Sequence, residues 1–225
     1  MSNALMLSLA NPQPGREQEY QDWYANRHLA DLIEVPSVLE AKLHKVTEHV
    51  PSRWRHAAIY QLAGDPQAAL AEIMEYGKAG KIEPSTASDP GDRIMGLATP
   101  ISERVGGPPD PDNVVLVVFT NPQPGQDDEY NRWYTEEHLA DVLAVPGFVA
   151  AQRYSFASPP GAPAPEWNYL ALYEIAADKV DEAFPALAAY AADGRMPISP
   201  ALDVERISMT PYRPIAVKAK AEATS

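Results

Sequence analysis

The sequence predicts an α+β fold made of two similar halves, and three observations support this prediction. First, residues 11–36 and 121–146 form a repeat, with 15 of 26 positions identical at a constant offset of 110. Such identity is far above chance and indicates an internal duplication. Second, each copy has its apolar residues at helical spacing and ends at Val-Pro. Third, strand-like segments surround each copy in the same order, so each half should bury its own core.

The first half begins with an apolar strand and continues into the repeated helix. Residues 5–11 are apolar enough for a buried strand, and two prolines and a glycine at 12–15 end it in a turn. From residue 16 to about residue 33, aromatic and apolar residues recur at spacings of three and four, which predicts a helix that stops before Pro36. The remaining expected elements are strands at 38–46, 54–62 and 93–102 and a helix at 66–76.

The second half repeats this order after a linker rich in proline, glycine and aspartate at 104–113. A loop at 157–165 is three residues longer than its counterpart, and beyond it the offset between the halves becomes 113, which aligns Trp54 with Trp167 and Tyr60 with Tyr173. The expected elements are strands at 114–120, 148–156, 166–175 and 204–209 and helices at 127–144 and 179–192. The last residues show no pattern, so we expect a flexible tail at 215–225.

The order β-α-β-β-α-β describes the ferredoxin-like unit. A four-stranded sheet with both helices on one face leaves the other face bare, and that face needs a cover. We therefore expect two units, 1–103 and 114–214, fused in tandem with their sheets packed face to face about a pseudo-twofold axis. The predicted architecture is an α+β barrel.

Composition excludes several classes of function. A formal net charge of −13 with no basic run argues against nucleic acid and against an anionic membrane surface. The chain has no cysteine, which excludes disulfides, thiolate catalysis and Cys-ligated metals. The first residues lack a basic segment followed by a long apolar run, so we expect neither a signal peptide nor a membrane span, and a cytoplasmic protein.

The repeated string W-Y-x-x-x-H-L-A-D, followed by V-P and a strand, resembles the dimeric α+β-barrel superfamily, and most closely its EthD-like and uncharacterised small-protein branches, here in tandem. This resemblance covers nearly all of both halves. It implies the barrel fold and a cleft between helices and sheet into which a helix histidine can reach. It leaves the chemistry open, because the superfamily includes cofactor-free oxygenases, cyclases, isomerases, lyases and haem enzymes.

The leading catalytic candidates lie on the repeated helix. His28 lies four residues after Tyr24 and three before Asp31, so an α-helix would place the three on one side. We expect the histidine to act as the general base, the aspartate to orient it and the tyrosine to donate to an oxyanion. The alternative is a structural clamp in which the histidine and aspartate tether the turn after the helix. The same set recurs in the second half as His138, Asp141 and Tyr134.

Other candidates differ between the halves. His44 and His56 could line the same cleft or lie on an exposed strand face, while His49 should face solvent. Trp23 and Trp133 could contact a flat apolar substrate or pack in the core. The second half has Tyr154 and Tyr169 at the aligned histidine positions. Cationic side chains near these positions could hold an anion, namely Lys42, Arg53, Arg55 and Arg153.

Three functions remain open from the sequence. The first is a cofactor-independent lyase, isomerase or cyclase that uses a helix histidine on an apolar or aromatic carbonyl or phenolic substrate. The second is a cofactor-free oxygenase of an aromatic substrate, and the third is a non-catalytic ligand-binding barrel. The histidines are scattered, which argues against a metal site, and haem on a helix histidine is the alternative that the resemblance implies. A homodimer is compatible with this architecture.

Overall fold

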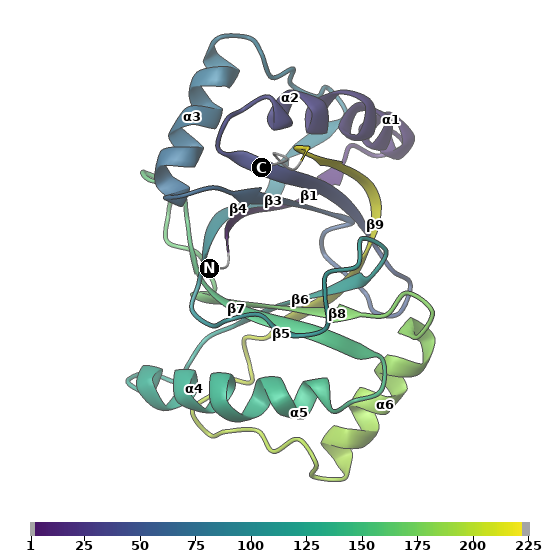
Figure 1. Ribbon diagram of the computed structural model, residues 1–225, viewed down its shortest axis with the longest axis vertical. Helices are drawn as coiled ribbons and strands as arrows, with labels where there is room; N and C mark the ends of the chain where they lie inside the picture. Colours follow the sequence, from purple (N-terminus) through teal and green to yellow (C-terminus); the bar gives the residue numbers. More distant parts are fainter. Residues whose placement is uncertain (1–2, 222–225) are drawn as a thin grey trace.

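The computed structural model describes residues 3–221, and in that range eight long strands close into an antiparallel barrel with helices on its outside (Figure 1). The first half contains β1 (Ala4–Pro12), α1 (Glu17–Trp23), η1 (Tyr24–His28), α2 (Leu29–Ile33), β2 (Val38–Val46), β3 (His56–Leu62), α3 (Pro66–Lys78) and β4 (Ser88–Pro100). The second half contains β6 (Val114–Thr120), α4 (Asp127–Trp133), η2 (Tyr134–His138), α5 (Leu139–Leu143), β7 (Phe148–Ala157), β8 (Tyr169–Ile175), α6 (Val180–Ala192) and β9 (Ser208–Ala219). The predicted α+β barrel is confirmed.

The sequence predicts two separate sheets packed face to face. In the structure the strands of both halves instead form one continuous hydrogen-bonded sheet. The strand order is β4-β1-β3-β2-β9-β6-β8-β7, and β7 pairs back onto β4. Both β4 and β9 are long enough to pair with a strand of their own half and then with a strand of the other half. These two pairings remove the free edges that isolated units would present.

Three layers of apolar side chains follow from this arrangement. One cluster lies between the helices and the sheet of the first half and includes Tyr20, Leu32 and Tyr60. A second lies in the corresponding place of the second half. The third fills much of the barrel interior, where Trp54 and Trp167 pack with residues from both halves. Because successive strand residues point to opposite faces, each strand contributes to a helix layer and to the barrel interior.

Two segments outside the predicted units belong to the sheet. Residues 215–219, predicted as flexible tail, are the end of β9, where Val217 pairs with Lys42 of β2. The prediction was wrong because the partner strand lies in the other half, about 170 residues away in sequence. Residues 222–225 of that tail lie outside the described residues. The predicted linker contains a two-residue strand, β5 (Val105–Gly106), which pairs with β7.

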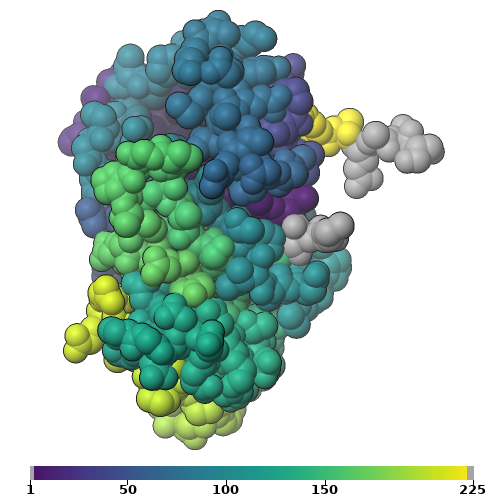
Figure 2. Space-filling model, turned by 90° about the vertical axis from the view of Figure 1, so that its left-hand side faces the viewer, coloured from purple at the N-terminus to yellow at the C-terminus, as the bar shows by residue number. Residues whose placement is uncertain are grey.

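The proline-rich loop between β7 and β8 lies on the outside of the barrel, next to the first half. Figure 2 shows the green surface of this region reaching the blue and purple surface of the first half. There the loop and β4 line a hollow of about 390 Å³. Within residues 3–221, no helix is both long enough and apolar enough to span a membrane.

Candidate functional site

The repeated helix contains a turn of π-helix in each half. The backbone N–H of Leu29 donates to the carbonyl oxygen of Tyr24, and Leu139 donates to Tyr134 in the second half, so both bonds span five residues. We had expected an uninterrupted α-helix. A π turn accommodates one extra residue and is frequent at functional sites. It lies in the same place in both copies and ends at the candidate histidine.

The π turn brings residues five apart onto the same side of the helix. The indole of Trp23 and the imidazole of His28 stack with ring centroids 4.3 Å apart, and Tyr24 meets the imidazole edge-on at 4.9 Å. Trp133 and His138 stack in the same way at 4.6 Å. Both histidines and both tryptophans therefore hold defined orientations through aromatic packing.

In the first half this stack lines an open cleft of about 730 Å³. The cleft lies between α1, η1 and α2 on one side and α3 with the loop before β4 on the other. Its lining combines an apolar and aromatic wall with a few polar groups. The lining residues that matter below are Ser8, Trp23, Tyr24, His28, Tyr60 and Arg93. This is the composition of a site for a flat apolar ligand with one or two polar atoms.

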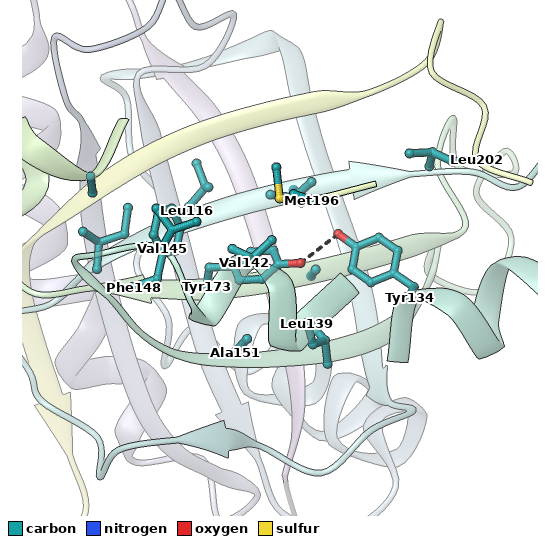
Figure 3. Packing of buried hydrophobic residues seen from close by; sticks show 14 of the residues in the cluster. Leu116, Tyr134, Leu139, Val142, Val145, Phe148, Ala151, Tyr173, Met196 and Leu202 are labelled. Carbon is teal, nitrogen blue, oxygen red and sulfur yellow. Dashed lines mark hydrogen bonds between the residues drawn. The ribbon is translucent and has the colours of Figure 1, made fainter. Parts of the chain in front are cut away.

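In the second half the corresponding space is filled. Met196 and Leu202, from the loop after α6, pack into the cluster that holds Tyr134 and Tyr173, and Tyr173 donates to Tyr134 at 3.3 Å (Figure 3). His138 is 9% exposed. The open and the filled copy distinguish the two halves, and the first half is the one with room for a ligand.

Arg153 completes the filling of the second half. Its side chain is 1% exposed, and its guanidinium lies over Tyr134 at 4.3 Å, with Tyr130 and Tyr169 also nearby. It donates to the carbonyl oxygen of Asn131, to the side-chain oxygen of Asn131 and to Thr135. All of these partners are neutral. The sequence analysis proposes that Arg153 could hold an anionic ligand, but its guanidinium packs against aromatic rings and bonds neutral groups instead.

The protonation states at the open cleft follow from burial. Burial lowers the pKa of His28 to about 4, against a smaller opposing effect of Asp31, so the imidazole is neutral near pH 7. Burial also raises the pKa of Tyr24, while Arg93 acts in the opposite direction. The pKa of Tyr60 is raised by burial and by Tyr24. The cleft thus presents a neutral base beside neutral phenols, which are hydrogen-bond donors.

The two aspartates do not orient the histidines, contrary to the prediction. The carboxylate of Asp31 accepts from the backbone N–H of Glu83 at 3.1 Å and lies 3.6 Å from Arg27, so it fastens the loop before β4 to the helix. Nδ1 of His28 and Nδ1 of His138 are both buried without a hydrogen-bond partner among the described residues. The carboxyl group of Asp141 stays partly exposed, and burial raises its pKa.

The remaining candidates divide between the two faces of the sheet. His56 lies on the helix side, 5.0 Å from the ring of Tyr20, and Tyr169 lies on that side of the second half, 5.0 Å from Tyr130. His44 and Tyr154 are buried on the barrel side, so they cannot meet substrate beside His28 or His138. His44 is therefore neither on an exposed face nor in the cleft.

The predicted anion-binding cations are engaged elsewhere. Lys42 pairs with Glu40, Arg53 with Asp92, and Arg55 with Glu17. His49 lies on the exposed surface, as predicted, where it bonds Asp181 at 2.8 Å and stacks on Phe184.

Sequence reasoning missed Arg93 as a residue of the cleft. It lies near the start of the regular pairing of β4 and lines the cleft beside Tyr24. Among residues 3–221, Arg93 makes no ion pair, so its charge is available to a ligand. No spacing or motif in the sequence marks it, because its position depends on how β4 pairs with β1.

Acid should destabilise the fold because four histidines are buried in their neutral form. Burial lowers the pKa of each imidazole from 6.5 to about 4, so between these values the unfolded chain binds more protons than the folded chain. The free energy of unfolding should fall as the pH falls through this window, by up to about 1.4 kcal/mol per pH unit for each histidine. The four residues are His28, His44, His56 and His138.

Urea unfolding midpoints measured from pH 7 to pH 5 test this expectation. The variant His44→Gln should show a shallower pH dependence than the natural protein, because one titrating group is gone. A midpoint that does not change over this range would contradict the buried neutral state of these histidines.

Haem does not fit His28. An iron-ligating histidine normally donates its second ring N–H to a carboxylate, a carbonyl or water. Nδ1 of His28 has no such partner, and one face of the ring is covered by Trp23 at 4.3 Å. The aspartate that could have supplied the support bonds Glu83 instead.

No protein-family model matches this chain, and no curated protein matches its sequence. Solved structures match over nearly its full length. An anthrone oxidase-like protein shares 15% identity and a TM-score of 0.65, covering 98% of this chain and 94% of that one. A proposed monooxygenase from Fusobacterium nucleatum shares 9% identity and a TM-score of 0.55, covering 98% and 95%. A variant of chlorite dismutase from Candidatus Nitrospira defluvii shares 12% identity and a TM-score of 0.54, covering 95% and 92%. At these identities the likeness shows the fold alone, which is an α+β barrel.

Proposed function

We propose that this protein is a small-molecule enzyme that works in the cleft beside His28 without a metal or an organic cofactor. The observation that carries the proposal is the difference between the two copies of one site. The same Trp–Tyr–His arrangement borders a cleft of about 730 Å³ in the first half and is buried within a core cluster in the second. The substrate is an aromatic molecule with a carbonyl or phenolic group, because aromatic walls surround a few polar groups.

The reaction begins with a proton transfer to His28. The imidazole lines the cleft and its Nδ1 is buried, so Nε2 is the ring nitrogen left for substrate. A C–H or O–H group next to a carbonyl or an aromatic ring gives its proton to Nε2, and the electron pair left behind moves onto the conjugated oxygen. Tyr24 donates a hydrogen bond to that oxygen, and the unpaired charge of Arg93 favours the anion.

The fate of the anion defines the reaction class. Return of the proton to a different carbon gives an isomer, attack within the molecule gives a cyclised product, and loss of a leaving group gives a lyase reaction. His28 gives its proton back to the new carbon in the isomerisation, to the oxygen formed in the cyclisation, or to the departing group in the lyase reaction, so each route returns it to its neutral form. The enzyme in this reading is a cofactor-independent isomerase, cyclase or lyase.

A cofactor-free oxygenase is the second candidate, and the fold likeness to an anthrone oxidase-like protein and to a proposed monooxygenase favours it. The first step is the same. The carbanion then reacts with dioxygen, and the CH₂ group becomes C=O with release of one water, so one oxygen atom enters the product and the other leaves as water. Aromatic stacking against Trp23 would hold such a substrate flat in the cleft.

The ancestry of the chain fits the same proposal. We propose that it is a tandem fusion of two ferredoxin-like units of the EthD-like type, in which one copy of the site kept its cleft. The repeated π turn and the repeated Trp–His stack support a common origin of the halves. The predicted homodimer and the cytoplasmic location stay predictions.

An exchange experiment separates the candidates. Anthrones and phenolic ketones are incubated with the protein in D₂O under argon, and loss of the acidic C–H signal is followed by proton NMR. The proposal expects exchange well above the buffer rate. Air is then admitted, and dioxygen uptake is recorded together with the quinone absorbance.

The outcomes are distinct. Exchange without dioxygen uptake supports the acid–base enzyme, whereas exchange with stoichiometric uptake supports the oxygenase. Tight binding of these compounds with neither exchange nor uptake would contradict both and would leave a ligand-binding barrel.

A further inference from the structure

The barrel interior contains a second cavity that the proposed reaction does not use. It has a volume of about 150 Å³ and is lined by residues of β1, β2, β3, β6, β7 and β8 and of the segment 104–113. Along β2, Leu43 packs in the helix layer, whereas the next residue, His44, lines this cavity. The cavity and the cleft beside His28 share no lining residue.

Four of the five charged groups around this cavity form two ion pairs, and the fifth, Asp110, accepts from the backbone N–H of Asp112. Lys42 lies 3.0 Å from Glu40, and Arg104 lies 2.8 Å from Glu174. Asn113 adds a second donor to Glu174 at 3.1 Å. The two ion pairs cancel each other's charge and the remaining carboxylate of Asp110 disfavours an anion, so the cavity suits a neutral ligand. The apolar part of the lining is Leu5, Ile59, Val115, Ala151 and Leu172.

The imidazole of His44 presents to this cavity a nitrogen that has no protein partner in the described part of the chain. His44 is 2% exposed, and its Nδ1 bonds the carbonyl oxygen of Ala57 at 3.2 Å. A carbonyl oxygen only accepts, so Nδ1 carries the hydrogen and Nε2 holds a bare lone pair. Nε2 has no hydrogen-bond partner among residues 3–221. Two neighbouring polar side chains are engaged, since Tyr154 donates to Gln152 at 2.9 Å and Gln152 donates to the carbonyl oxygen of Ser102.

We propose that the barrel interior is a second ligand site, which takes a small neutral molecule with one hydroxyl donor and a short apolar body. The hydroxyl donates to Nε2 of His44, and the apolar body lies against Leu5, Ile59 and Leu172. Nε2 is an acceptor of fixed tautomer that faces a cavity, and a donor from a ligand would satisfy its lone pair. This site stands independently of the reaction proposed for the cleft.

Two probes of nearly equal shape test the site on the full-length protein. Benzyl alcohol has the donor and the apolar body, whereas benzyl methyl ether lacks the donor. Each is titrated into ¹⁵N-labelled protein, and backbone amide shifts give the position and the dissociation constant. We expect benzyl alcohol to shift amides of residues that border the cavity, such as His44, Gln61 and Leu172, and not those of Trp23 or His28. The ether should bind about 5-fold more weakly, which is the contribution of one ordinary hydrogen bond.

The variant His44→Leu should bind the two probes equally, because the acceptor is gone while the apolar wall remains. If this variant does not fold, the affinities of the natural protein for the two probes still test the proposal. Equal affinity of the natural protein for both probes would overturn the proposal. Shifts confined to the cleft beside His28 would also overturn it, as would no shift up to the solubility limit, which would mean that the cavity holds only solvent.

Discussion

Replacing His28 with alanine should lower turnover of the exchange reaction at least ~100-fold, the low end of what a general base contributes. The melting temperature should change little, because the imidazole borders an open cleft and its Nδ1 bonds nothing in the described chain. Turnover is measured by proton NMR exchange, and stability by thermal unfolding monitored with circular dichroism.

The second copy provides the matched control. His138→Ala removes the same side chain from a filled site, so turnover should be unchanged while the fold loses about 2 kcal/mol from a new buried cavity. The opposite pattern, in which His138→Ala stops turnover and His28→Ala does not, would place the working site in the second half. Loss of folding with His28→Ala would favour the structural clamp.

The pH profile offers a further check on His28 within the same experiment. The residue accepts a proton only when it is neutral, and burial lowers its pKa to about 4. The value of kcat/KM should therefore rise as the pH increases through about 4 and stay level toward pH 7. A midpoint near the ordinary histidine value of about 6.5 would show that His28 is not the titrating base.

Replacing Arg153 with alanine should lower the free energy of unfolding by about 3–5 kcal/mol. The change removes three hydrogen bonds, leaves the side-chain oxygen of Asn131 without its donor in a partly buried place, and opens a void against Tyr134. Urea unfolding measured at pH 7 gives the free energy directly.

Arg153→Met separates packing from charge. Methionine fills much of the same volume without a charge to bury, and apolar replacement of a buried charge is often close to neutral, so this variant should lose much less stability than alanine. Burial lowers the pKa of His138 most, and the positive charge of Arg153 lowers it further. The pKa should therefore rise in both variants, which lack that charge. A loss below about 1 kcal/mol for Arg153→Ala would mean that the second half adjusts easily and is not held closed by this residue.

The elements of this fold could be predicted from the sequence because their signals are local. Apolar spacing in the repeated segment marked the helix, and Pro36 marked its end. The duplication showed that both halves share one architecture and identified Trp23 and His28 as a recurring pair. The strand 215–219 has a weak signal in the sequence, which is the alternation of apolar and charged residues from Val217 to Lys220.

The candidate site could be predicted only in part. Tyr24 and His28 lie together in the cleft, but the spacing that placed Asp31 beside them did not account for Arg27 and the backbone of Glu83, which take its carboxylate. The π turn has no characteristic amino-acid composition, because it differs from an α-helix only in that the backbone hydrogen bond spans five residues instead of four. Arg93 reaches the cleft through strand pairing, which sequence spacing does not encode.

The sequence by itself determined that this protein consists of two like halves, each with a helix that presents a tryptophan, a tyrosine and a histidine. Only the tertiary structure decided which half keeps an open cleft. The reason is packing: Arg153 stands where the first half has Leu43, and Met196 and Leu202 fold in from a distant loop. Whether a cavity exists depends on the summed volume of side chains from many elements, and no single stretch of sequence records that sum.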